Sequence, residues 1–236
     1  MPNQYFEFKN FRIDQSQTAM KVTTEGAILG AIAEVRNPHR ILDIGAGTGL
    51  ISLMLAQRYE EAMIDAIEID SRAVMDARFN FDQSPWQKRL QLFEDDARKW
   101  DSSYRYDMIV SNPPFFKSSL KSTNKQKNSA IHDDLLSQKD LIDIASRLLA
   151  DQGELVVIYP EFESNQFIEI ANDCGLYAEK QIDIYDHKGA SMLRRIVTLS
   201  RKPSSLEKLI FTIKKEKGGA YTGQFVDLMK PFYLYL

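Results

Sequence analysis

Short apolar runs alternate along the chain with segments in which apolar residues recur at helical spacing. The predicted strands cover residues 40–45, 62–70, 90–96, 106–112, 153–160, 177–186 and 194–201. The predicted helices cover residues 49–59, 71–83, 140–149 and 165–175. This order predicts an α/β fold with a mostly parallel, seven-stranded sheet and helices on both faces. The last two strands have no helix between them, so we expect them to form an antiparallel hairpin that gives the sheet an antiparallel edge strand.

Composition limits the class of protein. The chain has 30 basic and 33 acidic residues, a net charge of −3, so binding to a nucleic acid would need a local basic patch. The single cysteine, Cys174, cannot form an intrachain disulfide. No apolar run reaches the roughly 20 residues of a membrane span, and the N-terminus lacks the apolar core of a signal peptide. We therefore expect a soluble cytoplasmic protein, and the three histidines, which lack metal-ligand spacing, predict no metal site.

The first candidate site is a glycine-rich turn between the predicted strand at 40–45 and the next helix. Gly45, Gly47 and Gly49 form a G-x-G-x-G pattern, which would bring backbone N–H groups and a helix N-terminus around a ligand. A dinucleotide-binding turn would need glycine where this chain has Leu50. Asp43 before the turn suits a ligand with a cationic amine, such as S-adenosylmethionine.

Acidic residues end the next two predicted strands. Glu68 would lie beside the glycine turn, where a carboxylate can accept hydrogen bonds from both ribose hydroxyls of a nucleoside. Residues 94–96 end the following strand, and an aspartate there, such as Asp96, can bind the N6 amine of an adenine. A glycine turn and two acidic strand ends in succession predict a site for a nucleoside cofactor.

The sequence SNPPFF at 111–116 follows the predicted strand at 106–112. The Asn112 side-chain oxygen and the Pro113 carbonyl are two acceptors for the protons of a conjugated amine, and the consecutive prolines Pro113 and Pro114 restrict that carbonyl. Phe115 can stack on a base. These four residues predict methyl transfer to the exocyclic amine of a planar base.

Several segments carry a family resemblance. The chain resembles the Rossmann-like (class I) S-adenosylmethionine-dependent methyltransferases and, nearly end to end, the bacterial tRNA1(Val) (adenine-N6)-methyltransferases, which modify the adenosine just 3′ of the anticodon. The segments that carry it are 11–31, 42–58, 81–86, 111–116 and 225–236. One departure is Ile131, where relatives often have a basic residue.

The resemblance implies roles for particular residues. A segment before the first strand of the sheet would line the methionine end of the cofactor, with Glu68 at its ribose and Asp96 at its adenine. The catalytic tetrapeptide would be residues 112–115, and Asn112 would also contact the cofactor. The residues implied before the first strand are Lys21, Thr23 and Gly26. The chain would be a single methyltransferase domain, with an N-terminal segment at 1–37 that closes over the cofactor, a core sheet at 38–202 and a C-terminal strand and helix at 203–236.

A lysine-rich segment follows the tetrapeptide and is the candidate contact with RNA. Its lysines are Lys117, Lys121, Lys125 and Lys127. At the mouth of the site they would bind phosphates of the tRNA anticodon arm. We expect the protein to act as a monomer. The tetrapeptide alone leaves other acceptors open, namely a guanine N2 of rRNA or a glutamine N5 of a release factor. A non-catalytic RNA-binding module is a third possibility, which the intact tetrapeptide disfavours.

Overall fold

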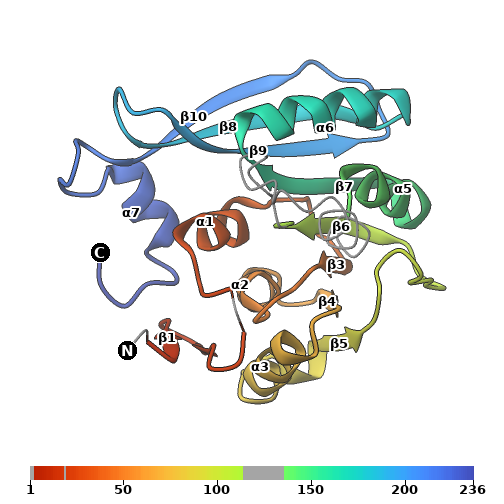
Figure 1. The fold of residues 1–236 in the computed structure, drawn as a ribbon, viewed down its shortest axis with the longest axis horizontal. Coiled ribbons are helices and arrows are strands. Elements are labelled where there is room, and N and C mark those ends of the chain that lie inside the picture. The colour runs from red at the N-terminus through yellow and green to blue at the C-terminus, as the bar shows by residue number, and fades with distance from the viewer. Residues whose placement is uncertain (1–2, 19, 114–135) are drawn as a thin grey trace, which may run out of the picture.

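An eight-stranded sheet forms the centre of the protein (Figure 1). The computed structural model describes residues 3–18, 20–113 and 136–236. The strand order is β10-β8-β9-β7-β6-β3-β4-β5, and neighbours run parallel except at β9, which is antiparallel to both β7 and β8. The strands are β3 (Arg40–Ile44), β4 (Met63–Glu68), β5 (Leu90–Glu94), β6 (Tyr106–Ser111), β7 (Leu149–Tyr159), β8 (Tyr177–His187), β9 (Met192–Ser200) and β10 (Glu207–Lys214).

The predicted fold class is confirmed, with a difference in the strand count and at one edge. The sheet has eight strands instead of seven because β10 pairs in parallel with β8. The antiparallel strand β9 therefore lies inside the sheet, and β10 is the edge. β10 buries Phe211 and Ile213, while Thr212 between them is half-buried and Ile210 before them is 67% exposed. This alternation suits a strand with one face on the core, and its pairing satisfies backbone groups of β8 that would otherwise remain at an open edge.

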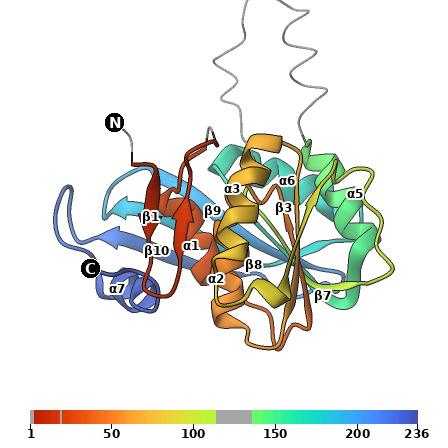
Figure 2. The ribbon, with the colours of Figure 1, turned by 90° about the horizontal axis from the view of Figure 1, so that it is seen from below.

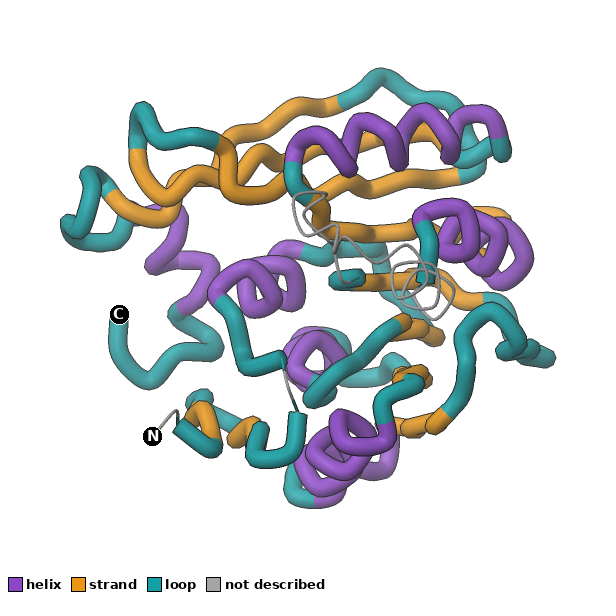
Figure 3. The backbone as a smooth tube through the Cα atoms, in the orientation of Figure 1, coloured by secondary structure: helices purple, strands orange, loops and turns teal. Residues whose placement is uncertain are grey.

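Helices cover both faces of the sheet (Figures 2 and 3). Alternating strand residues account for the two layers: Ile41 and Val156 belong to one apolar cluster with α1, α2 and α7, whereas Leu42 and Val157 belong to a second with α5 and α6. No helix among the described residues combines the length and apolarity of a membrane span. The helices are α1 (Thr24–Ile32), α2 (Leu50–Arg58), α3 (Ser71–Asp82), α5 (Gln138–Leu148), α6 (Glu161–Asp173), α7 (Gly223–Met229) and the 3₁₀ helix η1 (Gln87–Arg89).

The two ends of the chain pack together beside the sheet. β1 (Tyr5–Glu7) and β2 (Arg12–Asp14) form a separate antiparallel pair, and Phe8 makes an isolated bridge with Tyr233. The Phe8 ring stacks on Phe11 at 4.5 Å between centroids. The N-terminal segment is thereby fixed against the C-terminal one and leads directly into the site described next.

Candidate active site

The carboxyl ends of β3, β4, β5 and β6 are connected to one another by hydrogen bonds. The Gly45 N–H after β3 donates to the Ile67 carbonyl of β4 at 2.9 Å. The Asp95 N–H after β5 donates to the Glu68 carbonyl at 3.2 Å. The Ser111 hydroxyl of β6 donates to the Ile44 carbonyl of β3 at 2.8 Å. The predicted glycine turn, the acidic strand ends and the start of the tetrapeptide therefore meet at one edge of the sheet.

The three glycines of the turn all have positive φ, but they face different surroundings. The φ angles of Gly45, Gly47 and Gly49 are 72°, 57° and 79°. A Cβ at Gly45 or Gly47 would meet no atom within 4 Å, whereas one at Gly49 would lie 2.4 Å from Cε1 of Phe81. Gly45 and Gly47 thus border open space, and Gly49 is required for packing at the start of α2.

Glu68 supports this turn directly. Its Oε2 accepts a hydrogen bond from the Gly47 N–H at 2.8 Å, and its Oε1 accepts from the N–H groups of Ile69 and Asp70, both at 2.9 Å. A carboxylate has about four lone-pair positions, so one remains for a further donor. Glu68 therefore holds the turn after β3 against the end of β4, independently of any contact with a ligand.

Asp43 lies behind the turn. Its side chain is fully buried, and its Oδ2 accepts from the Ser52 hydroxyl at 2.6 Å and from the Ser52 N–H at 3.1 Å. Burial raises the pKa of Asp43 to about 7. Its Oδ1 is buried and has no hydrogen-bond partner among the described residues. The observed contacts join β3 to α2, and contact of Asp43 with a cofactor stays a prediction.

Asp96 is held by a neighbour. Its carboxylate pairs with the Arg98 guanidinium at 2.8 Å, and hydrogen bonds from Arg98 lower the pKa of Asp96. The side chain is 13% exposed. Asp96 is therefore a fixed, ionised acceptor at the end of β5.

Two adjoining pockets lie along this edge and share Gly45. One is lined by the sequence-predicted residues Lys21, Thr23, Gly26, Gly45, Gly47 and Asn112, together with Met20 and Val22. The other is lined by Gly45, Glu68 and Asp96, together with Ile67 and Ala97. The predicted methionine-side residues thus gather in one pocket and the predicted nucleoside-side residues in the other. Asp43 and Gly49 are not among the described lining residues.

Asn112 lines the first pocket beside the start of α1. A Cβ at Gly26 would lie 3.6 Å from Nδ2 of Asn112 and 3.4 Å from Oγ1 of Thr23, which are ordinary contact distances, so the amide packs close to the first turn of the helix. Thr23 caps α1 by accepting a hydrogen bond from the Gly26 N–H at 3.1 Å. Pro113 is buried.

Part of the predicted site lies outside the described residues. This part comprises Pro114, Phe115, Lys117, Lys121, Lys125, Lys127 and Ile131. A second basic group lies on β9 and β10, where Arg195 pairs with Asp183 at 3.0 Å and Lys214 with Asp186 at 3.0 Å. These pairs neutralise positive charge that would otherwise be available to a phosphate.

The sequence pattern did not identify two polar residues of α3 that hydrogen-bond to the segments around the first pocket. Asp76 and Asn80 are 3% and 2% exposed, and both bond to the N-terminal segment. The available signal was their spacing, since polar residues four apart lie on the same helical face as the buried Ala73, Ala77 and Phe81. Buried polar side chains need partners, and these partners lie about 60 residues earlier in the chain.

Neither a metal centre nor the large cavity elsewhere in the described part of the chain replaces this site. Among the described residues no three His, Cys, Asp or Glu side chains are grouped so as to hold a metal ion. A separate cavity of about 650 Å³ is lined by Tyr59 and Glu154 and by Val35 and Asn37, which precede β3. It therefore lies at the amino-terminal edge of the parallel strands, away from Asn112 and the glycine turn.

Comparison with known proteins defines the class to which this fold and site belong. Residues 24–186 match the model of the methyltransferase small domain family. A predicted O-methyltransferase from Agrobacterium tumefaciens has the same fold, with a TM-score of 0.65 and 20% identity over 87% of this chain and 95% of that one. The protein is thus a member of the methyltransferase small domain class.

Full-length relatives define the family more narrowly. A tRNA1(Val) (adenine(37)-N6)-methyltransferase from Trichodesmium erythraeum is 42% identical over 99% of both chains. One from Phocaeicola vulgatus is 41% identical over 99% of both chains. The chain belongs to the tRNA1(Val) (adenine(37)-N6)-methyltransferase family, as its sequence resemblance predicted.

Proposed function

We propose that the protein transfers a methyl group from S-adenosylmethionine to N6 of adenine 37 in tRNA1(Val). The single observation that carries this proposal is the position of Asn112. It follows β6 and lines the same pocket as Gly45 and Gly47, so an amine acceptor adjoins the open space above the glycine turn. The names of relatives about 40% identical over the full length support the same substrate.

The residues present fit the cofactor. The positive φ angles of Gly45 and Gly47, with open space where a Cβ would stand, leave a cradle for the part of the ligand that crosses the turn. Glu68 would accept from the ribose and Asp96 from the adenine amine, while Lys21 and Thr23 would border the methionine end. The bound cofactor supplies an electrophilic methyl group on a sulfonium.

Asn112 and Pro113 would prepare the adenine amine for attack. The amine is a weak nucleophile because its lone pair is delocalised into the ring. Hydrogen bonds from its two protons to the Asn112 amide oxygen and the Pro113 carbonyl favour a pyramidal nitrogen whose lone pair points at the methyl group. As the new N–C bond forms, the S–C bond to the sulfonium would break, and only then does the amine proton become acidic. It can pass to solvent, so no strong base is needed beside the amine.

Recognition of tRNA belongs to the same proposal. The lysines at 117–127 directly follow the tetrapeptide in the chain, so they suit contacts with phosphates around the target base. We infer that the anticodon arm is the part of tRNA that is bound, that one copy of the chain suffices, and that the reaction takes place in the cytoplasm.

The decisive experiment is methylation of defined acceptors by the purified protein. Transcripts of tRNA1(Val) with adenine or guanine at position 37, rRNA and a release factor are incubated separately with S-adenosylmethionine, and their nucleosides or peptides are analysed by mass spectrometry. N6-methyladenosine should form only in the adenine transcript. Methylation of rRNA guanine or of a release-factor glutamine instead would replace this proposal, and RNA binding without methylation would reduce the protein to a binding module.

A further inference from the structure

Helix α3 holds the wall of the pocket assigned to the methionine end of the cofactor, although it contributes none of that pocket's described lining residues. The wall is the segment 14–23, described except for residue 19, and its residues Met20, Lys21, Val22 and Thr23 line the pocket. A segment of this kind has little secondary structure of its own. Its position must come from side-chain contacts.

Asn80 supplies the first of these contacts and connects the segment to the glycine turn. Its Oδ1 accepts from the Asp14 N–H at 2.7 Å, and its Nδ2 donates to the Asp14 carbonyl at 2.8 Å. The same Nδ2 donates to the Thr48 carbonyl at 2.9 Å. One buried amide thus joins the two walls of the pocket, because Thr48 is part of the turn and also lines it.

Asp76, one helical turn earlier, holds the next stretch. Its carboxylate accepts from the Thr18 N–H at 2.8 Å and from the Gln17 N–H at 3.1 Å. Gln15 connects this stretch to the pocket wall, because its Oε1 accepts from the Val22 N–H at 2.7 Å and its carbonyl accepts from the Lys21 ammonium. The contacts with α3 therefore fix Asp14, Gln17 and Thr18, which flank Gln15, and Gln15 in turn bonds the pocket wall.

We propose that Asp76 and Asn80 are positioning residues for the cofactor, acting through segment 14–23 on the methionine-side pocket. This inference rests on the proposed function, since it takes S-adenosylmethionine as the ligand. The nucleoside-side pocket has no described lining residue from segment 14–23. The two halves of the ligand should therefore respond differently when the contacts with α3 are lost.

The test compares S-adenosylhomocysteine, which has both halves, with adenosine, which has only the nucleoside half. In Asn80→Ala and Asp76→Ala the Kd for S-adenosylhomocysteine should rise about tenfold, because buried backbone groups lose their partners and the wall moves. The Kd for adenosine should stay close to that of the parent. With saturating cofactor the kcat should be largely retained, so the effect appears in the KM for S-adenosylmethionine.

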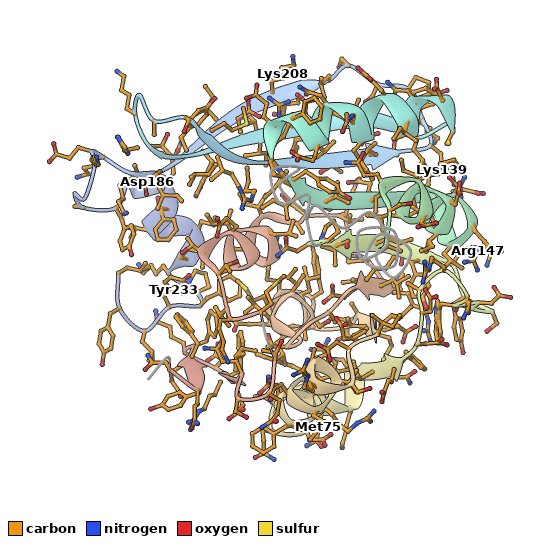
Figure 4. The ribbon with its side chains drawn as sticks, viewed as in Figure 1. Met75, Lys139, Arg147, Asp186, Lys208 and Tyr233 are labelled. Carbon is orange, nitrogen blue, oxygen red and sulfur yellow. The ribbon has the colours of Figure 1, made fainter. Side chains whose placement is uncertain are left out.

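Control variants separate positioning from folding. Met75→Ala changes the exposed face of the same helix, where the Met75 side chain is 61% exposed, and should leave both Kd values unchanged (Figure 4). Asp76→Asn keeps an acceptor oxygen and should restore much of the affinity lost in Asp76→Ala. All variants are compared well below their unfolding temperatures, as determined by circular dichroism.

The outcomes are distinguishable. If folded Asn80→Ala and Asp76→Ala bind S-adenosylhomocysteine as the parent does, or if they lose adenosine and S-adenosylhomocysteine equally, the positioning role is refuted. If the parent itself binds neither ligand, the proposed function fails first. Should both alanine variants unfold, Asp76→Asn decides the matter. It should retain most of the affinity while amide hydrogen exchange in segment 14–23 becomes faster, and unchanged exchange would contradict the proposal.

Discussion

The carboxylate of Glu68 accepts a hydrogen bond from the backbone N–H of Gly47 at 2.8 Å, across 21 positions of the chain. This contact couples the end of β4 to the glycine turn after β3. Gly47 lines the first pocket two positions after Gly45, which both pockets share, so Glu68 shapes the turn in addition to its predicted contact with the ribose. A substitution at Glu68 therefore tests two functions, which a pair of variants can separate.

Glu68→Ala should weaken the binding of S-adenosylhomocysteine by about 1–3 kcal/mol, because hydroxyl and amide donors lose their acceptor. Glu68→Gln retains one acceptor oxygen and should lose less. Isothermal titration calorimetry measures both. If Glu68→Ala bound the ligand as tightly as the parent, the assignment of Glu68 to the ribose would be wrong.

Asn112→Ala should lower kcat by about 10²–10³ while the affinities for cofactor and tRNA stay near those of the parent, since the amide contact strengthens as the nitrogen becomes pyramidal. Phe115→Ala should weaken tRNA binding and rate together, because stacking stabilises the flipped base. Single-turnover kinetics at saturating tRNA checks both, after circular dichroism has established folding. Parental rates in folded Asn112→Ala would refute the amine-acceptor mechanism.

Gly47→Ala and Gly49→Ala should have different effects, because Gly47 borders the space proposed for the cofactor and Gly49 packs against Phe81. Each places a side chain at positive φ, which costs about 1–2 kcal/mol of stability. Gly49→Ala should lose more, because its Cβ would meet Phe81 at 2.4 Å, while Gly47→Ala should chiefly lose cofactor affinity. Thermal denaturation and calorimetry measure the two effects. Equal stability losses would mean that Phe81 moves away freely.

Asp43→Asn should change how stability depends on pH. The pKa of Asp43 is raised by burial from 3.8 to about 7, so the folded protein keeps a proton that the unfolded chain releases. This contribution to stability is present at acidic pH and is lost as the pH rises through about 7. The unfolding temperature of the parent relative to Asp43→Asn should therefore fall between about pH 4 and about pH 7 and stay level at higher pH. A constant difference over this range would mean that Asp43 stays ionised.

The contribution of the lysine-rich segment at 117–127 to tRNA binding can be tested by substitution. Replacing Lys121, Lys125 and Lys127 together by alanine should raise the KM for tRNA and flatten the dependence of affinity on salt, because fewer counterions are released on binding. Single-turnover methyl transfer at saturating tRNA should be nearly unaffected. An unchanged salt dependence would assign these lysines to a solvated loop without contact to RNA.

The sequence by itself determined the order of the elements and the edge at which the site forms. Apolar periodicity located the strands at 40–45, 62–70, 90–96 and 106–112, and parallel strands place their carboxyl ends together. Glu68 and Asn112 could therefore be assigned to one site without coordinates. Motif residues of this kind are predictable because they occupy fixed places relative to local structure.

Only the tertiary structure decided which partners these residues have. Periodicity marks a face as buried but does not identify what covers it, so β10 was not placed next to β8, and the contact of Asp43 with Ser52 was not foreseen. The same limit applies to Asn80, whose partners Asp14 and Thr48 lie 66 and 32 positions away. Such contacts form between segments that are distant in the sequence and adjacent in the fold. The local pattern of apolar and polar residues does not specify which distant segment will be the partner.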